Sequence, residues 1–184
     1  MLRGNRELWF AFLAMLGITG VYALVVVFTR EIPPASELFG HGLGIVGFTF
    51  MLMTETLYSL RKRSRSVKWG KMSNWLQFHI FTGLVGPYMV LLHTSWKFNG
   101  IAGITTLFTI IIVISGFIGR YIFTRIPRTL DGTEIEGRLS PEALRRARRL
   151  FALWHTIHIP IGMVLFVSAF FHMGAALYYA TFLK

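Results

Sequence analysis

Five stretches of this 184-residue sequence are long and apolar enough to cross a lipid bilayer as helices. A helix needs about 20 predominantly apolar residues to span the hydrocarbon core. The chain is 54% hydrophobic, above the about 45–50% of an ordinary soluble domain. We therefore expect one all-α integral membrane domain over residues 1–184, a bundle of five transmembrane helices. The expected spans are residues 8–28, 38–60, 75–96, 101–123 and 150–182, the last preceded by a basic helix over 141–150.

The distribution of Lys and Arg predicts how these helices are oriented. If the N-terminus is cytoplasmic, all but three of the 19 Lys and Arg residues fall on the inner face, and the exceptions are Arg30, Lys97 and Lys184. Inner loops of membrane proteins carry such an excess of positive charge. The sequence thus predicts a cytoplasmic N-terminus, an outer C-terminus and parallel third and fifth helices, in the cell inner (plasma) membrane.

Composition excludes several kinds of site. The sequence contains no cysteine, which rules out disulfides, thiolate metal sites, iron–sulfur ligation and the covalent attachment of c-type haem. The net charge of +11 fits a basic cytoplasmic face, which binds anionic headgroups of the lipid bilayer. No nucleic-acid recognition module is visible, so we do not expect nucleic acid as a partner.

One histidine pattern occurs twice. The order Trp-x3-His-x3-Gly-x9-His stands at residues 75–93 and again at residues 154–172. On a helix, 14 residues make almost four turns, so both histidines of a pair lie on one face, about 21 Å apart along the axis. That separation places one near each side of a hydrocarbon core about 30 Å thick. The histidines are His79 and His93 in the third span, and His158 and His172 in the fifth.

Parallel helices bring these histidines to matching depths. His79 would then meet His158 at the inner level, and His93 would meet His172 at the outer level. Buried histidines in a membrane need partners, and two irons, each with two axial imidazoles, would supply them. The pattern predicts two stacked haem b groups in closed six-coordinate sites, which suit electron transfer. The alternative is four structural histidines bonded to hydroxyls or backbone carbonyls.

Two glycines stand one turn beyond the inner ligands. Gly83 and Gly162 each follow an inner histidine by four residues, and a missing side chain there would let a porphyrin lie against the backbone. Ordinary small-residue packing between membrane helices is the alternative. Such packing is also expected at four further glycines: Gly44, Gly47, Gly116 and Gly119.

Charged and aromatic residues near the helix ends are candidates for the haem propionates. Arg120 and Arg125 end the fourth span on the inner side, and Trp96 and Lys97 stand at the outer turn. An arginine inside a span needs a partner, and an inner propionate is one candidate. Snorkelling of the arginines and simple interfacial anchoring by Trp96 and Lys97 are the alternatives.

Three further ionisable residues have no fixed role in this arrangement. His155 could replace His158 as a ligand, although an interfacial position suits it better. His41 has no partner expected at its own level, so a third haem is not predicted. Glu55 lies inside the second span, where an ionisable group is a functional candidate by default. Its expected partner is Arg61, and a proton route to a quinone is the alternative.

With these residues the chain resembles the ferric reductase-like transmembrane superfamily. That group includes the membrane halves of NADPH oxidases, ferric reductases and small bacterial haem subunits of oxidoreductases. The match covers roughly residues 38–182, and its specific part is the histidine spacing on the third and fifth helices. The resemblance implies electron passage from one side of the membrane to the other. A similar spacing also occurs in the dihaem cytochrome b of quinol–cytochrome c oxidoreductases.

The sequence departs from the large members of that superfamily. They continue into a flavin and nicotinamide domain, whereas this sequence ends after the fifth span and has no G-x-G-x-x-G. We therefore expect an electron-transfer subunit that is not catalytic alone. Its redox partners would be a flavin or iron–sulfur subunit or a quinol, and an outer-face donor or acceptor.

Two other functions remain open at this point. One is a quinone-reactive cytochrome b subunit, with a quinone pocket lined by His41, Glu55 or His155. The other, from a different class, is a haem-free membrane anchor or small transporter. The repeat is parallel and centred on histidine, whereas transporters often carry inverted repeats.

Overall fold

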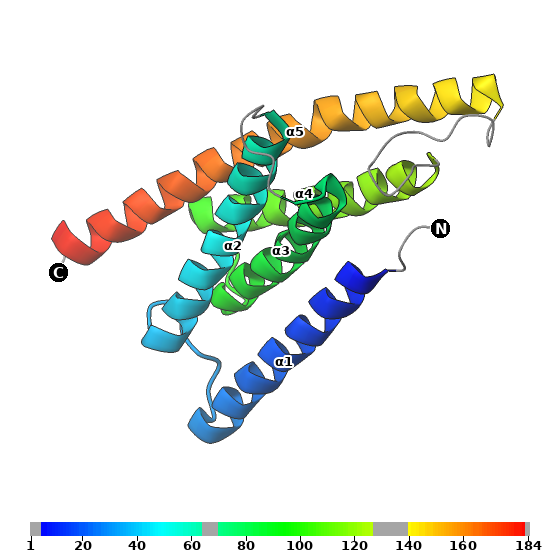
Figure 1. The fold of residues 1–184 in the computed structure, drawn as a ribbon. Helices are drawn as coiled ribbons and strands as arrows, with labels where there is room; N and C mark the ends of the chain where they lie inside the picture. The colour runs from blue at the N-terminus through cyan, green and yellow to red at the C-terminus, as the bar shows by residue number, and fades with distance from the viewer. Residues whose placement is uncertain (1–4, 64–69, 127–139, 183–184) are drawn as a thin grey trace. The chain divides into compact units, whose positions relative to one another are not determined.

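The computed structural model is all-helical over the residues that it describes, 5–63, 70–126 and 140–182 (Figure 1). Each of its helices is long and apolar enough to cross a membrane, so the prediction of a five-span, multi-pass membrane protein in contact with the bilayer is confirmed. The predicted basic helix continues without a break into the last span. The helices are α1 (Arg6–Thr29), α2 (Leu38–Arg63), α3 (Met72–His93), α4 (Gly100–Thr124) and α5 (Pro141–Phe182).

The described chain divides into two compact units. The first unit contains α1, α2 and α3, and the second unit contains α4 and α5. Several cations that predict the orientation, such as Arg65 and Arg128, lie outside the described residues. The sidedness of the termini, the choice of membrane and the single-domain organisation stay predictions.

Within the first unit, α2 and α3 run antiparallel at close range. A Cβ atom added at Gly47 would lie 2.8 Å from the Gly86 carbonyl oxygen, and one added at Gly86 would lie 2.8 Å from the Gly47 carbonyl oxygen. Only glycine on both helices allows the backbones to approach so closely. The contact between α2 and α3 is the most extensive between any two helices described.

Helix α1 packs against α3 in parallel. The Thr19 hydroxyl of α1 hydrogen-bonds the Tyr88 hydroxyl of α3, and nearer the start of both helices Phe10 and Phe78 line one cavity. This parallel course agrees with the predicted up-and-down order of the first three helices. The buried core of the first unit consists of Ala11, Leu43, Val85, Met89 and Leu92.

The second unit is an antiparallel pair. The Trp154 ring of α5 lies directly over Gly119 of α4, where a Cβ atom would overlap the indole. Further along, Gly162 of α5 faces Ile112 of α4. The predicted packing role of glycine is confirmed at Gly44, Gly47 and Gly119. At Gly116 a Cβ atom would meet nothing within 4 Å among the described residues, so this glycine makes no packing contact within its own unit.

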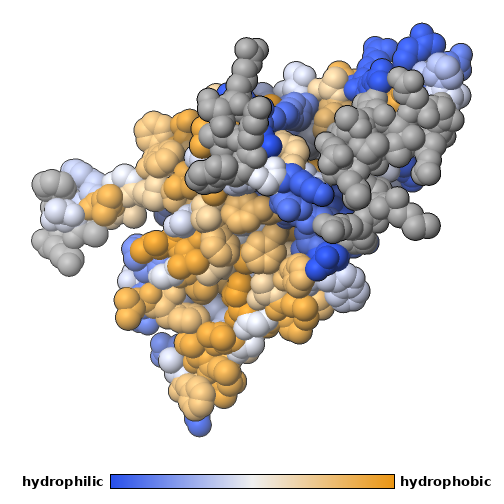
Figure 2. Space-filling view, in the orientation of Figure 1, coloured by the Kyte–Doolittle hydropathy of each residue, from blue (hydrophilic) through white to orange (hydrophobic). Residues whose placement is uncertain are grey.

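Large apolar side chains are exposed on α1, α2, α4 and α5, as membrane spans require, and orange covers much of the surface seen in Figure 2. Helix α3 ends three residues earlier than predicted, at His93. Ser95 and Trp96 then adopt positive φ angles of 50° and 61°, which end the helix. The Ser95 hydroxyl, which is buried, donates to the Pro33 carbonyl, so the turn after α3 is tied to the loop before α2.

Candidate functional site

The two histidines of α3 are both held by α2. His79 Nδ1 lies 3.0 Å from the Thr54 carbonyl oxygen, and His93 Nδ1 lies 2.8 Å from the Gly40 carbonyl oxygen. The two carbonyls are 14 residues apart, like the two histidines, because the helices are antiparallel. A carbonyl accepts only, so each Nδ1 must carry its proton and donate. That tautomer leaves the lone pair on Nε2, the atom through which either ring would bind a metal.

Gly44 makes room for His93, the second histidine of α3. A Cβ atom at Gly44 would lie 2.9 Å from both Cγ and Nδ1 of His93, which is closer than real Cβ contacts. The His93 ring therefore packs flat against the backbone of α2 at Gly44. The inner ring has a different neighbour, since the Tyr58 ring centroid lies 4.8 Å from that of His79.

His41 lies beside His93. Their ring centroids are 6.4 Å apart and the rings meet edge to face at 66°. His41 therefore has His93 as a neighbour, and the absence of a third haem at His41 stays a prediction. The reason is register: Gly40 supplies the carbonyl that holds His93, and His41 is the next residue of α2.

In the second unit, α4 holds His158 of α5. His158 Nδ1 lies 3.0 Å from the Ser115 hydroxyl. Trp154 Nε1 donates to the Ser115 carbonyl at 2.7 Å and contacts its hydroxyl at 3.2 Å. The Trp154 and His158 ring centroids are 4.7 Å apart. Sequence reasoning missed Ser115, although a buried serine inside an otherwise apolar span is a signal for a bonded polar group.

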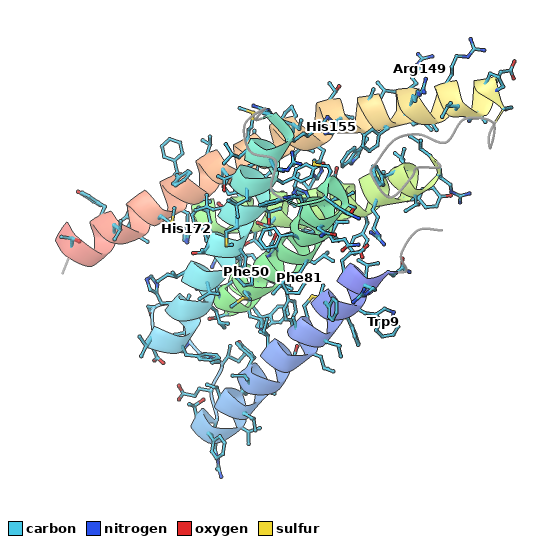
Figure 3. All side chains as sticks on the ribbon, viewed as in Figure 1. Trp9, Phe50, Phe81, Arg149, His155 and His172 are labelled. Carbon is cyan, nitrogen blue, oxygen red and sulfur yellow. The ribbon has the colours of Figure 1, made fainter. Side chains whose placement is uncertain are left out.

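The other two histidines of α5 are labelled in Figure 3. His155 belongs to an aromatic cluster, with its ring stacked on Phe151 at a centroid distance of 5.8 Å and an interplanar angle of 22°. Its centroid is 5.5 Å from that of Trp154. His172 is half-buried on the same helix. Packing against Phe151 one turn earlier supports the structural reading of His155 over its use as a substitute ligand.

The two glycines of the repeat face the partner helix of their own unit. A Cβ atom at Gly83 would lie 3.4 Å from the Thr54 methyl group, and one at Gly162 would lie 3.9 Å from the end of Ile112. These are ordinary van der Waals distances, so either position would accept a methyl group. The helix contacts therefore do not require glycine at Gly83 or Gly162, and the porphyrin surface stays a prediction.

The charged and interfacial candidates occupy helix ends. The Arg125 guanidinium lies 4.6 Å from the centre of the Tyr121 ring and donates to its hydroxyl. Arg120 is half-buried on α4. Trp96 and Lys97 are exposed in the turn after α3. Arg120 and Arg125 thus lie near the predicted end of the fourth span, whereas Trp96 lies in a turn beyond the end of α3.

Glu55 contacts Ser59, and its predicted partner Arg61 contacts Gly70. Its carboxylate accepts a hydrogen bond of 3.5 Å from the Ser59 hydroxyl, one turn further along α2. Arg61 donates to the Gly70 carbonyl at 3.3 Å, so this arginine ties α2 to the loop before α3.

Each predicted haem pair takes one histidine from each unit. His79 and His93 belong to the first unit, and His158 and His172 to the second, so the pairing stays a prediction. Within residues 5–63, 70–126 and 140–182, no group of three or more His, Asp or Glu side chains is placed to hold a metal ion. A bis-histidine haem needs only two such ligands.

Comparison with known proteins does not assign a function, so a proposal of function depends on the residues described above. The sequence matches no protein family model, no curated protein and no solved structure.

The histidine environments nevertheless fit a haem. Metal-binding histidines almost always donate their other ring N–H to a carbonyl, carboxylate or water, which fixes the tautomer and the ring direction. His79 and His93 have this arrangement with backbone carbonyls, and His158 has a hydroxyl in the same position.

Proposed function

We propose that this protein is a dihaem membrane cytochrome b that passes single electrons across the bilayer as a subunit of a larger oxidoreductase. The observation that carries the proposal is the anchoring of three of the four repeated histidines through Nδ1 to an oxygen of the neighbouring helix. In His79 and His93 this arrangement leaves the lone pair on Nε2, the atom that would bind an iron, and in all three it holds the ring in place.

The residues of the chain would orient and enclose the cofactors. His79 and His158 would be the axial ligands of the inner haem, and His93 and His172 those of the outer haem. The haems, when bound, would supply one-electron iron chemistry. Two imidazoles on each iron leave no open axial position, so the protein would transfer electrons and not bind oxygen.

The ends of the spans would complete the two sites. Arg120 and Arg125 are candidates for the inner propionates, where a guanidinium pairs well with a carboxylate. Trp96 and Lys97 are candidates on the outer side. The donor and acceptor would be a flavin or iron–sulfur subunit or a quinol on one side, and a further redox partner on the other.

A haem-free anchor or small transporter is the competing function. It uses the same histidines as structural groups, satisfied by the Thr54, Gly40 and Ser115 oxygens. The two functions differ in one respect: a structural histidine needs only its Nδ1 bond, whereas a ligand needs Nε2 as well.

Single histidine substitutions test the proposal. We expect His79→Ala, His93→Ala, His158→Ala and His172→Ala each to lose one of two b-type haems per chain. His41→Ala is the matched control: it removes an exposed imidazole 6.4 Å from His93 and should keep both haems. A purified protein that contains no haem, or whose haem is unchanged by all four substitutions, contradicts the proposal.

A further inference from the structure

The start of α5 carries a dense positive charge. Glu142 is the only carboxylate of this helix. Figure 2 shows blue side chains gathered at the start of α5, and Figure 3 labels Arg149 there. An anion from outside the helix would be attracted to this end of it. The cations are four exposed arginines within five positions: Arg145, Arg146, Arg148 and Arg149.

The other side of the same segment packs against α4. Leu144, Ala147 and Phe151 are half-buried, and they stand three and four residues apart, so they lie on one face of α5. The Phe151 ring lies 5.9 Å from the Phe123 ring of α4. Apolar packing therefore holds the start of α5 on this face, and the arginines are left on the exposed side.

Two of the arginines share a face with an exposed apolar stripe. Residues three or four apart are neighbours on a helix surface, and this spacing connects Arg146 to Leu150, Leu150 to Leu153 and Leu153 to Ile157. Arg149 stands four residues before Leu153 and three after Arg146. The three apolar side chains expose 46%, 54% and 59% of their surface. We call these five residues the arginine–leucine face.

The arginine–leucine face matches the two parts of a phospholipid. Helix α5 is long and apolar enough to span a membrane, so the change from exposed arginine to exposed leucine after Arg149 marks the polar surface of the bilayer. Leu153 and Ile157 lie about 6 and 12 Å deeper along the helix axis. A phosphate held by the arginines would therefore place its hydrocarbon chains beside the apolar stripe.

An acidic protein fits this face less well. Its carboxylates could meet the arginines, but a water-exposed protein surface would not reach Leu153 and Ile157 within the hydrocarbon. The arginines also suit a phosphate, because a guanidinium donates two parallel hydrogen bonds to two phosphate oxygens. The combination of arginines and an apolar stripe on one face favours a lipid.

The basic end of α2 provides a comparison within the same chain. The Lys62 ammonium lies 5.9 Å from the centre of the Tyr58 ring, and Arg61 donates to the Gly70 carbonyl. These cations contact groups of their own unit. A general attraction between anionic lipids and basic residues would act at both helix ends, whereas a discrete site on α5 would not depend on α2.

We propose that the arginine–leucine face binds one anionic phospholipid, with the phosphate between Arg146 and Arg149 and an acyl chain along the three apolar residues. The bound lipid would hold the start of α5 at the bilayer surface. This proposal goes beyond electron transfer and does not depend on haem.

Lipid binding is measured on the full chain purified in detergent, with native mass spectrometry to count the lipids bound. The probe is palmitoyl-oleoyl phosphatidylglycerol, and phosphatidylcholine with the same chains is the zwitterionic reference. We expect one phosphatidylglycerol per chain to bind roughly tenfold more tightly than phosphatidylcholine, because each basic residue near an anionic lipid contributes about fivefold.

Charge variants locate the site. Arg146→Gln with Arg149→Gln should weaken phosphatidylglycerol binding about 25-fold, from two contributions of about fivefold. Leu153→Asn should weaken it severalfold, because the acyl chain loses an apolar contact. Lys62→Gln with Arg63→Gln removes the same charge from α2 and is the matched control, which should bind as the parent does. All five side chains are exposed, so the variants should fold.

Three results would overturn the proposal. Equal binding of the two lipids would show that the face does not select an anion. Equal losses in the α2 and α5 charge variants would show a general attraction to basic residues. Displacement of the lipid by soluble glycerophosphoglycerol or by polyglutamate, with Leu153→Asn lacking any effect, would make the face a site for a soluble anion or an acidic protein. No measurement requires haem, so the results are separate from the test of the proposed cytochrome.

Discussion

The α2–α3 and α4–α5 pairs carry the same histidine pattern on their second helix but hold the first histidine of that pattern differently. His79 meets a backbone carbonyl, that of Thr54, whereas His158 meets a side-chain hydroxyl, that of Ser115. A carbonyl fixes the tautomer of its histidine, and no substitution can remove it. A hydroxyl both donates and accepts, so the state of His158 depends on a side chain that mutation can change.

Trp154 adds a second contact between the helices of the α4–α5 pair. Trp154 packs over Gly119 and bonds Ser115, so it locks α5 onto α4. Trp75 contacts Phe78 on its own helix, at a ring distance of 6.3 Å. The inner-pattern histidine of α5 is therefore held by side chains of α4 and α5, whereas His79 is held by the backbone of α2.

The largest effect expected is on haem content, in double variants that test how the two pairs combine. His79→Ala with His158→Ala should lose one haem and keep the other, because both belong to the inner site. His79→Ala with His172→Ala should lose both. The number of haems per chain is measured from the pyridine haemochrome spectrum. Equal losses in the two variants would show that the proposed pairing of the histidines, into an inner and an outer site, is wrong.

A smaller but local effect is expected at Gly44. A methyl group there would meet the His93 ring at 2.9 Å, so Gly44→Ala should displace the ring and lower the outer haem content severalfold. Gly42→Ala is the control, because a Cβ atom at Gly42 meets nothing within 4 Å among the described residues. Equal haem in both variants would mean that the His93 ring does not need its present position.

A similar comparison applies to helix packing. Gly47→Ala should destabilise the α2–α3 pair by about 1–3 kcal/mol, the usual cost of overpacking, because the new atom meets the Gly86 carbonyl at 2.8 Å. Gly17→Ala on α1 has open space and should be neutral. Thermal unfolding in detergent compares them, and a neutral Gly47→Ala would show that the close approach of the backbones is not needed.

The smallest effect expected distinguishes the two inner histidines. Ser115→Ala removes the hydroxyl that contacts His158 Nδ1 and should shift the inner haem potential by tens of mV, since a tenfold change in a one-electron equilibrium is about 59 mV. Ser115→Thr keeps a hydroxyl and should restore the potential. A redox titration measures the potentials of both haems, and the outer haem serves as the internal reference. An unchanged inner potential would show that the Ser115 hydroxyl does not influence the inner haem.

The sequence was sufficient for features that depend on length and composition. The five spans, the continuous helix from Pro141 and the packing glycines at Gly44, Gly47 and Gly119 follow from hydropathy and residue size. The early end of α3 did not follow, because it depends on the positive φ angles of Ser95 and Trp96. Apolar Trp96 continues the hydropathy pattern and gives no sign of that turn.

Features that depend on helix register were harder to predict. The contact of His41 with His93 and the bond from Ser115 to His158 need the offset between two antiparallel helices, which hydropathy does not contain. The same holds for Gly116, which points away from α5 although it resembles Gly119 in sequence. The four histidines of the repeated pattern could be predicted from spacing alone, because His79 and His93 lie on one helix and His158 and His172 lie on another.

The central claim is that the chain binds two b-type haems, and the most direct test is a reduced-minus-oxidised spectrum of the purified protein with haem quantified per chain. The account predicts a b-type spectrum and a ratio close to two. A ratio close to one would leave half of the histidines structural. A protein with no Soret band would contradict the cytochrome and favour a haem-free membrane anchor or transporter.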